Sequence, residues 1–449
     1  MSFFGKPASG MSDGVKVYAL LVLTLVYAFN FIDRYILVVM QELIKADLGL
    51  SDTQLGVLSG FTFALFYVTA GLPVARLADR SNRRNIVAGA LTIWSAMTAL
   101  SGLVQSYGQL VAARIGVGIG EAGCSPPAHS MISGMFSEKR RATALAIYSS
   151  GLFFGVLLGY LVGGQLAEIF GWRTTFLMVG LPGIALAMLL MTTVPEPARH
   201  ADDSLPTGTG ADQPKASLAD TLGLTAMVVM LKDRTFRTVA LASAIAAFFG
   251  YGIGNFMPSF LARYHGLDAG DVGLTLALAG GFGGMVGSFG GGYLADRIAA
   301  RGDMRWYLWT PGLASVIGLG FYVLTFLSGR LDVVILSIFL GQIFSTMYLA
   351  PAIATSHRLV SARQRAMASA VLYFVINLIG LGLGPVTVGA LSDLLRALSG
   401  VEQLREALLI TLAFGVIKAW LFWRAGTLLP GAIARRDAEK QAAAGKGGP

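Results

Sequence analysis

Long apolar runs alternate with short polar stretches along almost the whole chain. Most runs hold 20 residues or more, and a helix of about 20 residues crosses the hydrocarbon core of a bilayer. The pattern predicts an all-helical membrane protein with twelve transmembrane helices. The predicted spans are 17–43, 53–75, 85–105, 108–132, 142–168, 173–194, 236–262, 270–295, 306–327, 331–355, 364–392 and 405–429.

The composition supports this class. The chain has 449 residues, of which 55% are hydrophobic and 13% charged, whereas soluble domains carry about 25% charged residues. Glycine is abundant, and in the span 142–168 Gly151, Gly155 and Gly159 recur every four residues. Small residues at this spacing let helix backbones approach closely in lipid. We therefore expect tight helix packing around this span.

A polar stretch divides the chain into two parts. Residues 198–220 are rich in Gly, Pro and Ser, and the basic segment 225–237 after them is partly amphipathic. Such a stretch is typical of a linker, and such a segment of a helix on the membrane surface. The predicted organisation is an N-terminal six-helix half (1–194), a cytoplasmic linker with a surface helix (195–235), a C-terminal six-helix half (236–429) and a cytoplasmic tail (430–449).

The two halves repeat each other in sequence. Their matching segments are ARLADR (75–80) with GYLADR (292–297), Gly56 with Gly273, Pro126 with Pro351, and RATALA (141–146) with RAMASA (365–370). The offsets are 217 for the first two pairs and 224 or 225 for the others. Two related six-helix halves are typical of secondary transporters.

The basic residues predict the orientation. With both termini in the cytoplasm, most of the 34 Lys and Arg residues lie on the cytoplasmic side, as the positive-inside rule requires. We expect a multi-pass protein of the cell inner (plasma) membrane. The residues predicted on the outer side are Lys45, Arg173, Arg263, Arg330, Arg396 and Arg405, and those predicted within the membrane are Arg34, Arg114 and Lys418.

Several function classes lack their sequence signals. The chain has one cysteine, Cys124, and four histidines without ligand spacing, so no metal site is expected. The G-x-G-x-x-G pattern at 118–123 lies inside a predicted span rather than after a strand. The basic residues lie in loops between spans, so nucleic acid is not an expected partner. We expect no enzyme activity and no cofactor.

Four charged residues interrupt the predicted spans of the first half. Asp33 and Arg34 lie in 17–43, and Arg114 and Glu121 lie in 108–132. A charge at the bilayer centre costs about 2.5–3.5 kcal/mol on insertion scales, so it usually faces the protein interior and has a function. Arg114 and Glu121, seven residues apart, share one helix face. Because adjacent helical residues point about 100° apart, we expect Asp33 to share a cavity with Arg114 and Glu121. We expect the Arg34 side chain to face a neighbouring helix or the inner gate instead. A purely structural ion network is the alternative.

The loop after the second predicted span reads Ala75-Arg76-Leu77-Ala78-Asp79-Arg80-Ser81-Asn82-Arg83-Arg84. It resembles the signature loop of the major facilitator superfamily, with Ala75 and Asn82 where that family usually has glycine. An Asp at a helix end facing basic residues and a helix N-terminus can act as a latch; a plain positively charged loop is the alternative. The predicted cytoplasmic gate comprises Asp79, Arg80, Arg83, Arg84, Asp296 and Arg297.

The second half differs in its chemistry. Its spans contain no clearly buried carboxylate. Lys418 lies near the middle of the last span, and the sequence assigns it no role. Its polar candidates for a cavity are Asn255, Tyr348, Tyr373 and Asn377. We therefore expect a cavity that is charged on its N-terminal side and mostly apolar on the other.

Two segments resemble the spinster-type branch of the superfamily: Asn30-Phe-Ile-Asp33-Arg34-Tyr35, and Arg114 with Gly118-Ile-Gly120-Glu121-Ala122 and Pro126. The resemblance implies proton-linked alternating-access transport of an amphiphile such as a lysophospholipid or a sphingoid phosphate. In this hypothesis Asp33 and Glu121 couple protons, and Arg114 and Arg34 bind the head group or relay charge. The partners would be lipid-like substrate and protons, and the protein would be a monomer.

Other functions share these residues. Proton-coupled symporters of organic anions such as sugar acids also combine Asp-Arg in the first span with Arg and Glu in the fourth. Drug-type efflux is a further alternative. A sensor or scaffold that binds lipid without moving it belongs to a different class, and sustained flux in liposomes would distinguish it from a transporter.

Overall fold

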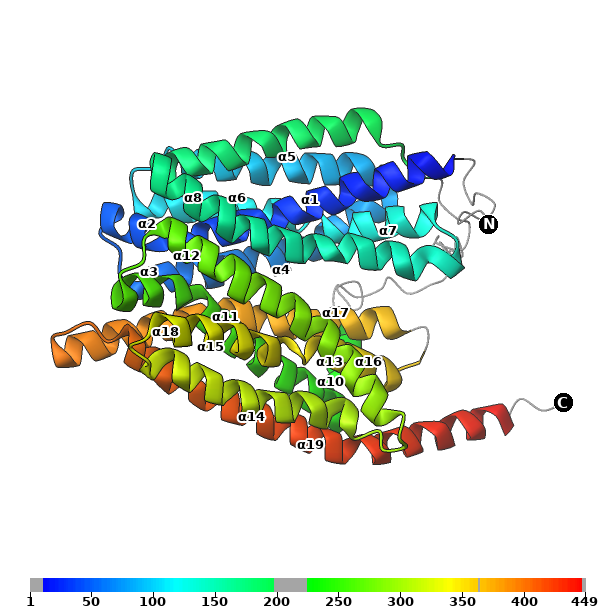
Figure 1. Ribbon diagram of the computed structural model, residues 1–449. Coiled ribbons are helices and arrows are strands. Elements are labelled where there is room, and N and C mark those ends of the chain that lie inside the picture. Colours follow the sequence, from blue (N-terminus) through cyan, green and yellow to red (C-terminus); the bar gives the residue numbers. More distant parts are fainter. Residues whose placement is uncertain (1–10, 198–223, 362–363, 446–449) are drawn as a thin grey trace. The chain divides into compact units, whose positions relative to one another are not determined.

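The computed structural model describes residues 11–197, 224–361 and 364–445 (Figure 1). These residues form helices and connecting turns, with no strand among them. The chain divides into two compact units. Unit 1 comprises Met1–Ser51, Val57–Lys215 and Leu261–Ala277, and unit 2 comprises Asp52–Gly56, Ala216–Phe260 and Leu278–Pro449.

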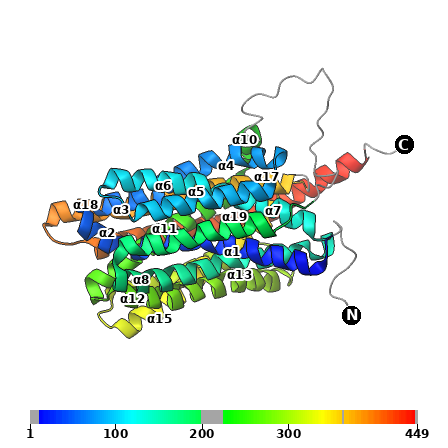
Figure 2. The same cartoon turned by 90° about the horizontal axis from the view of Figure 1, so that it is seen from above.

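Unit 1 is built mainly from the first half of the chain. Its helices are α1 (Asp13–Val39), α2 (Gln41–Leu48), α4 (Thr62–Arg80), α5 (Arg83–Ser101), α6 (Tyr107–Glu121), α7 (Ser125–Met135), α8 (Glu138–Thr193) and α12 (Ala269–Thr275), with a π-helical segment at Val57–Phe61. Helices α5 and α6 lie side by side (Figures 1 and 2).

Unit 2 holds most of the second half. Its helices are α3 (Asp52–Gly56), α10 (Leu224–Lys232), α11 (Arg234–His265, whose last residues belong to unit 1), α13 (Gly283–Ala299), α14 (Trp306–Leu327), α15 (Leu331–Thr346), α16 (Leu349–Arg358), α17 (Arg365–Val375), α18 (Gly382–Ser399) and α19 (Leu404–Gly445). Two π-helical segments lie at Leu276–Phe282 and Ile376–Leu381.

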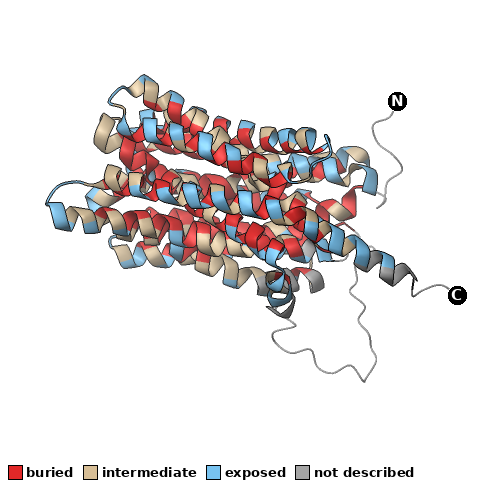
Figure 3. Cartoon of the chain, turned by 90° about the horizontal axis from the view of Figure 1, so that it is seen from below, coloured by how far each residue is buried: buried red, intermediate tan, exposed pale blue. Residues whose placement is uncertain are grey.

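Among the described residues, nine helical stretches are long and apolar enough to cross a membrane. Many large apolar side chains on them are exposed, for example Phe154, Met188 and Leu313, and buried and exposed positions alternate around the helices (Figure 3). A bilayer would cover this exposed apolar surface. The all-helical membrane fold is thus confirmed, and the number of twelve passes stays a prediction.

Glycines set the contact between α1 and α8. A Cβ atom at Gly155 would lie 2.6 Å from the Cβ of Phe31, and one at Gly151 would lie 2.6 Å from the carbonyl oxygen of Thr24. Real Cβ atoms do not approach so closely, so these positions need glycine. The four-residue glycine spacing therefore serves packing.

The long helix α8 contains one turn that only glycine adopts readily. Gly171 has φ 77° and ψ 162°, which lies in the positive-φ region that side chains with a Cβ avoid. This residue lies between the predicted spans 142–168 and 173–194. Gly171 therefore redirects the chain where the sequence predicts a break.

Two other breaks are related by the internal repeat. Helix α6 ends at Glu121, before α7, and α15 ends at Thr346, before α16. Glu121 and Thr346 are 225 residues apart, the same offset as Pro126 and Pro351. The sequence predicts each pair of helices as one span, 108–132 and 331–355. Both repeats therefore break the corresponding helix at the same place.

Two carboxylates accept hydrogen bonds from helix N-termini, and their positions are also related by the internal repeat. In unit 2, Asp393 accepts hydrogen bonds from the backbone N–H groups of Asp52 (3.2 Å) and Thr53 (2.8 Å) at the start of α3. In unit 1, Glu168 accepts one from Gly270 (3.0 Å) in α12. Negative charge is stabilised at a helix N-terminus. These contacts join 52–56 to unit 2 and 261–277 to unit 1, whereas the predicted linker residues 198–223 lie outside the described residues.

Candidate functional site

The four intramembrane charges of the first half come together in unit 1. Helix α1 carries Asp33 and Arg34, and α6 carries Arg114 and Glu121 at its end. Asp33, Arg114 and Glu121 are each 1% exposed, and the Arg34 side chain is 15% exposed. Two positive and two negative groups are thus enclosed in one unit, which we call the charge cluster.

Arg34 and Glu121 form an ion pair. The Arg34 Nη2 lies 2.6 Å from Glu121 Oε2, and Arg34 Nε donates to the same oxygen at 2.7 Å. Arg34 Nη2 also donates to Asn30 Oδ1 at 3.2 Å. The expectation that Arg34 lies apart from the cluster was wrong. A 100° difference in direction between neighbouring residues does not separate them when one has a side chain as long as arginine.

Aromatic rings enclose the Arg34 guanidinium. Its Cζ lies 4.5 Å from the ring centroid of Phe63, 4.9 Å from Phe31 and 5.1 Å from Tyr67. A cation over an aromatic face gains electrostatic attraction, which is larger where water is excluded. The rings and Glu121 together hold Arg34 in one position.

Asp33 contacts α5. Its Oδ2 accepts a hydrogen bond from Thr98 Oγ at 3.1 Å. The carboxylate is within electrostatic range of Glu121 and Arg114. Asp33 has no ion pair within 4 Å among the described residues, so it is the less compensated of the two carboxylates.

Arg114 is buried with hydrogen-bond donors to spare. Its Nε and Nη1 groups have no partner among the described residues, and its Cζ lies 5.7 Å from the Phe63 ring. A buried donor without a partner costs about 1–3 kcal/mol, and more when it is charged. Glu121 and Asp33 interact with the Arg114 charge. Two donors of this buried cation are therefore unused by the described residues.

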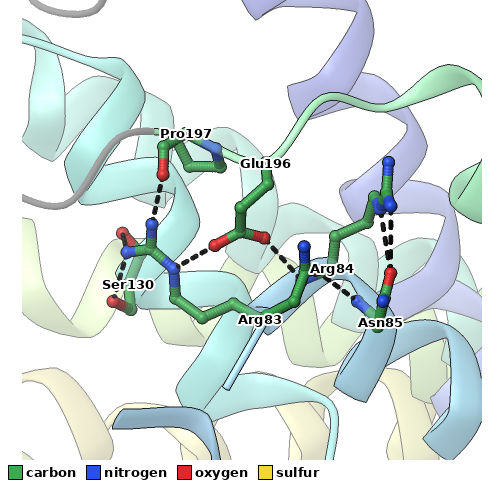
Figure 4. A network of polar contacts seen from close by, with 7 residues as sticks. Arg83, Arg84, Asn85, Ser130, Glu196 and Pro197 are labelled. Atoms are coloured by element: carbon green, nitrogen blue, oxygen red, sulfur yellow. Dashed lines mark hydrogen bonds and ion pairs between the residues drawn. The ribbon is translucent and has the colours of Figure 1, made fainter. Parts of the chain in front are cut away.

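The residues of the predicted cytoplasmic gate differ in their contacts. The side chains of Asp79 and Arg80 lie outside the described residues. Arg83 is 2% exposed and is held inside unit 1: its Nε donates to Glu196 Oε1 at 2.7 Å, and its Nη1 to Ser130 Oγ at 3.0 Å (Figure 4). Its Nη2 donates to the Pro197 carbonyl oxygen at 2.5 Å.

Glu196 also accepts a hydrogen bond from the N-terminus of α5. Its Oε2 accepts a hydrogen bond from the backbone N–H of Arg84 at 2.8 Å (Figure 4), while the Arg84 side chain contacts Asn85. Figure 4 shows both arginines arranged around this carboxylate. Arg83 and Arg84 therefore fix the end of α8 to the start of α5.

The gate residues of the second half lie in unit 2. Asp296 Oδ1 accepts a hydrogen bond from the Tyr307 hydroxyl at 2.7 Å, and Arg297 Nη1 donates to the Tyr293 hydroxyl at 2.6 Å. Arg358 Nη2 donates to Tyr307 at 3.0 Å. Asp296 and Arg297 thus bind separate tyrosines, and their role as a latch stays a prediction.

The polar candidates of the second half are spread over four elements of unit 2. Asn255 on α11 is 7% exposed, and Tyr373 on α17 is 42% exposed. Asn377 lies in the π-helical segment Ile376–Leu381. Tyr348 precedes α16, and its hydroxyl is within electrostatic range of the Tyr251 and Tyr373 hydroxyls. Of the four candidates, Tyr348 and Tyr373 interact electrostatically.

Sequence reasoning missed several residues around the charges. Thr98, Phe63, Tyr67 and Glu196 contact the charged groups. Asn30 stood in the segment that carries the resemblance, one helical turn before Arg34. Thr98, Phe63 and Tyr67 are common residue types in apolar surroundings, and no pattern in one sequence distinguishes them.

Comparisons with known proteins identify the family. The family model of the Major Facilitator Superfamily matches residues 23–385. An MFS-type efflux pump of Mycolicibacterium smegmatis (strain ATCC 700084 / mc(2)155) is 39% identical over 404 residues, 89% of this chain and 91% of that protein. A probable galactarate/D-glucarate transporter of Bacillus subtilis (strain 168) is 28% identical over 66% of this chain and 68% of that protein.

Two further relatives are named for lipid or spinster-type transport. A sphingosine-1-phosphate transporter of Mus musculus is 27% identical over 91% of this chain and 76% of that protein. The inward-facing, unoccupied crystal structure of a bacterial homologue of the human lysosomal transporter Spinster has a TM-score of 0.82. It is 31% identical, with coverage of 94% of this chain and 99% of the other. The chain belongs to the major facilitator superfamily, in its branch of spinster-type membrane transporters.

Proposed function

We propose that this protein is a proton-linked secondary transporter of amphiphilic lipids such as lysophospholipids or sphingoid phosphates. It works by alternating access as a twelve-span monomer of the inner (plasma) membrane, with both termini cytoplasmic. The relative named for sphingosine-1-phosphate transport supports the substrate class.

The observation that carries the proposal is the buried guanidinium of Arg114. It lies in electrostatic range of Asp33 and Glu121, yet two of its donors have no partner among the described residues. In a low-dielectric interior such donors bind an anionic group strongly when one arrives. Arg114 therefore suits the head group of an anionic substrate.

Protonation of Asp33 and Glu121 controls how strongly these two carboxylates attract Arg114. When Asp33 and Glu121 are ionised, their charges compete with the substrate for Arg114 and Arg34. A proton that binds either carboxylate removes one negative charge and leaves a guanidinium for the head group. Release of that proton on the other side of the membrane restores the competition and expels the substrate. This reciprocal effect is the linkage that coupled transport requires.

The amphiphilic substrate follows from the surroundings of the charges. In unit 1 the guanidinium of Arg34 is enclosed by Phe31, Phe63 and Tyr67. In unit 2 the polar candidates are two separate asparagines and two tyrosines, and the tyrosines present hydroxyls on largely apolar rings. A hydrophilic substrate would need more polar groups than these. A long alkyl chain is better matched.

A flux measurement tests the substrate class. Purified protein in liposomes would be offered a radiolabelled lysophospholipid, a radiolabelled sphingoid phosphate or D-glucarate, with and without an imposed pH gradient. We expect gradient-dependent flux of an amphiphile and none of D-glucarate. Gradient-dependent flux of D-glucarate alone would contradict the lipid proposal. Binding without flux in every case would indicate a sensor.

The relatives also support two alternatives. The sugar-acid carrier of Bacillus subtilis favours a proton-coupled organic-anion symporter, in which the charge cluster would keep its roles. The efflux pump of Mycolicibacterium smegmatis favours export of drug-like compounds. A cationic amphiphilic dye transported faster than the anionic lipids would favour efflux, because Arg114 would then have no anion to bind.

A further inference from the structure

The two exchanged segments of the chain are held in place by matching contacts. Asp52–Gly56 belongs to unit 2 and Leu261–Ala277 to unit 1, although each continues along the chain into the other unit. Helix α3 packs on α18, and α12 packs on α8. We call these contacts the unit 2 clasp and the unit 1 clasp, and the proposed function assigns neither of them a role.

Glycines bring two backbones together in the unit 1 clasp. A Cβ atom at Gly164 of α8 would lie 2.9 Å from the Cα atom of Gly273 in α12, and it would clash with the carbonyl oxygen of Ala269. A Cβ atom at Gly273 would clash in turn with the carbonyl oxygen of Tyr160. Because backbone atoms oppose both glycines, no change of rotamer makes room for alanine.

The unit 2 clasp has the same construction. A Cβ atom at Gly389 of α18 would lie 2.6 Å from the carbonyl carbon of Asp52. One at Gly56 of α3 would lie 2.7 Å from the carbonyl carbon of Pro385. Small residues thus allow α3 to lie directly on α18, as they allow α12 to lie on α8.

A carboxylate completes each clasp at the start of the exchanged helix. Glu168 of α8 accepts a hydrogen bond from the Gly270 N–H at 3.0 Å, and Asp393 of α18 accepts one from the Thr53 N–H at 2.8 Å. Negative charge is stabilised at a helix N-terminus. Each exchanged helix is therefore held both by backbone packing and by charge.

The internal repeat relates the two clasps residue by residue. Corresponding residues are 225 apart on α8 and α18 and 217 apart on α12 and α3: Tyr160 with Pro385, Gly164 with Gly389, Glu168 with Asp393, Gly270 with Thr53, and Gly273 with Gly56. Each of them makes the same kind of contact in both units. The clasps are thus two copies of one arrangement.

A π-helical segment follows each exchanged helix. Val57–Phe61 lies between α3 and α4, and Leu276–Phe282 lies between α12 and α13. The division of the chain into units falls at the start of the first segment and within the second. Short π-helical turns are rare and are frequent at functional sites. Each π-helical segment is therefore placed as a hinge for the helix before it.

Both clasps lie near residues predicted on the outer side of the membrane. Arg396 Nη2 donates to Asp393 Oδ1 at 3.0 Å, and Arg173 follows Glu168 by five residues. We therefore assign the clasps to the outer side.

We propose that the two clasps form one conformational device: both are closed in this structure, and both part together when the transporter opens to the outside. Each exchanged helix is covalently continuous with the unit in which it does not pack. Movement of one half against the other therefore separates α3 from α18 and α12 from α8 at the same time. Close backbone packing makes the closed arrangement a discrete state. The inference deepens the proposed function and rests on its alternating access, not on its substrate.

Labelling of a thiol buried in one clasp measures whether that clasp opens. Ser392 on α18 is 1% exposed, and its Oγ donates to Asp52 Oδ2 at 2.6 Å. Ser392→Cys is nearly isosteric, and a maleimide reaches the thiol when α3 leaves α18. The full chain with this reporter would be labelled by a membrane-impermeant maleimide in intact cells and in lipid nanodiscs. The natural protein gives the background, since its Cys124 is 1% exposed.

The variants to be tested lie in the other clasp. Gly164→Ala places a methyl group against the backbone of α12, and Glu168→Gln removes the negative charge at the start of that helix. Gly155→Ala is the matched control, because it introduces a similar clash on α8 but against α1, where its Cβ would lie 2.6 Å from that of Phe31. The reporter stays in the unit 2 clasp throughout.

We expect Gly164→Ala to raise the labelling rate at least about tenfold, because overpacking of the closed arrangement populates the open one. Glu168→Gln should raise it about two- to fivefold, the range for a charge at a helix N-terminus. Gly155→Ala should lower the unfolding temperature and leave the labelling rate unchanged. In intact cells the reagent should react without permeabilisation.

Unchanged labelling in both Gly164→Ala and Glu168→Gln would overturn the inference, because the clasps would then open independently. An equal rise in Gly155→Ala would overturn it too, since a loosened fold would expose the thiol. If Gly164→Ala does not fold, Glu168→Gln against Gly155→Ala decides. Reaction in cells only after permeabilisation would overturn the assignment to the outer side.

The substrate is tested separately from this device, because labelling needs no ligand. The expected labelling without flux of any amphiphile would support the inference and contradict the proposed lipid function. Flux of an amphiphile, with no change of labelling in either variant, would support the function and overturn the inference.

Discussion

At the scale of single residues, the cost of burying charge explains both what the sequence predicted and what it missed. Asp33, Arg34, Arg114 and Glu121 were identifiable because a charge in an apolar span needs a reason to persist. Which of these residues form an ion pair was not identifiable, because helix geometry fixes the direction of a Cβ atom but not the reach of an arginine side chain. In the structure Glu121 forms an ion pair with Arg34, and two donors of Arg114 have no partner among the described residues.

Thr98 tests how Asp33 is held. Thr98→Val removes the hydroxyl that donates to Asp33 at 3.1 Å and leaves a buried carboxylate without that bond. We expect the free energy of unfolding to fall by about 1.5–3 kcal/mol, the value for hydrogen bonds to charged groups. Thermal unfolding in nanodiscs measures it. Thr98→Ser restores the hydroxyl and should recover most of the loss; equal loss in both variants would contradict the role of the hydroxyl.

At the scale of helices, hydrophobic runs predict where spans lie but not how they are interrupted. The breaks after Glu121 and Thr346, and the three π-helical segments found among the described residues, leave no mark in hydropathy. The repeat of Pro126 at Pro351 was visible in the sequence, and the breaks lie close to these prolines. Neither proline alone predicts the residue at which the preceding helix ends. These interruptions place Glu121 and Tyr348, so the site depended on features that periodicity does not report.

The turn at Gly171 is one interruption whose cost can be measured. A Cβ atom there has no neighbour within 4 Å, so Gly171→Ala tests the positive φ of 77° alone. We expect a loss of about 1–3 kcal/mol in unfolding free energy. Gly89→Ala is the control, since Gly89 lies inside α5 with the same open space, and alanine should stabilise that helix by about 0.5–1 kcal/mol. The same sign in both variants would contradict this explanation.

The contact between Asp393 and α3 is a second test at this scale. Asp393 accepts hydrogen bonds from two backbone N–H groups. Asp393→Asn removes its negative charge and should lower the unfolding free energy by about 1 kcal/mol. Asp332→Asn is the control, because Asp332 pairs with Arg330 where both side chains are mostly exposed, and such pairs contribute little. An equal effect of the two changes in a thermal-unfolding series would show that the helix N-terminus is not stabilised by Asp393.

At the scale of the whole molecule, the repeated sequence and the basic loops predicted a two-half transporter. Similarity over most of the chain to superfamily members confirms the family. The exchange of short segments, with 52–56 in unit 2 and 261–277 in unit 1, was not predictable, because it depends on contacts such as Glu168 with Gly270 that are far apart in sequence. The orientation in the membrane still rests on the distribution of Lys and Arg.

Labelling of introduced cysteines tests that orientation. The native Cys124 is 1% exposed, so it should give little background. Arg330 is predicted outside, and Asp303 lies in a predicted cytoplasmic loop. A membrane-impermeant maleimide added to intact cells should label the Arg330→Cys variant, and should label the Asp303→Cys variant only after permeabilisation. The reverse order would invert the topology.

The most direct test of proton-coupled transport through the charge cluster is lipid flux in liposomes, with and without a pH gradient, for the natural protein and Asp33→Asn. The amide has the shape of the carboxylate and cannot take up the proton, so we predict that the gradient no longer drives flux while thermal unfolding shows an intact fold. Asp332→Asn should keep the full response. A full response to the pH gradient in Asp33→Asn would contradict the coupling role of Asp33.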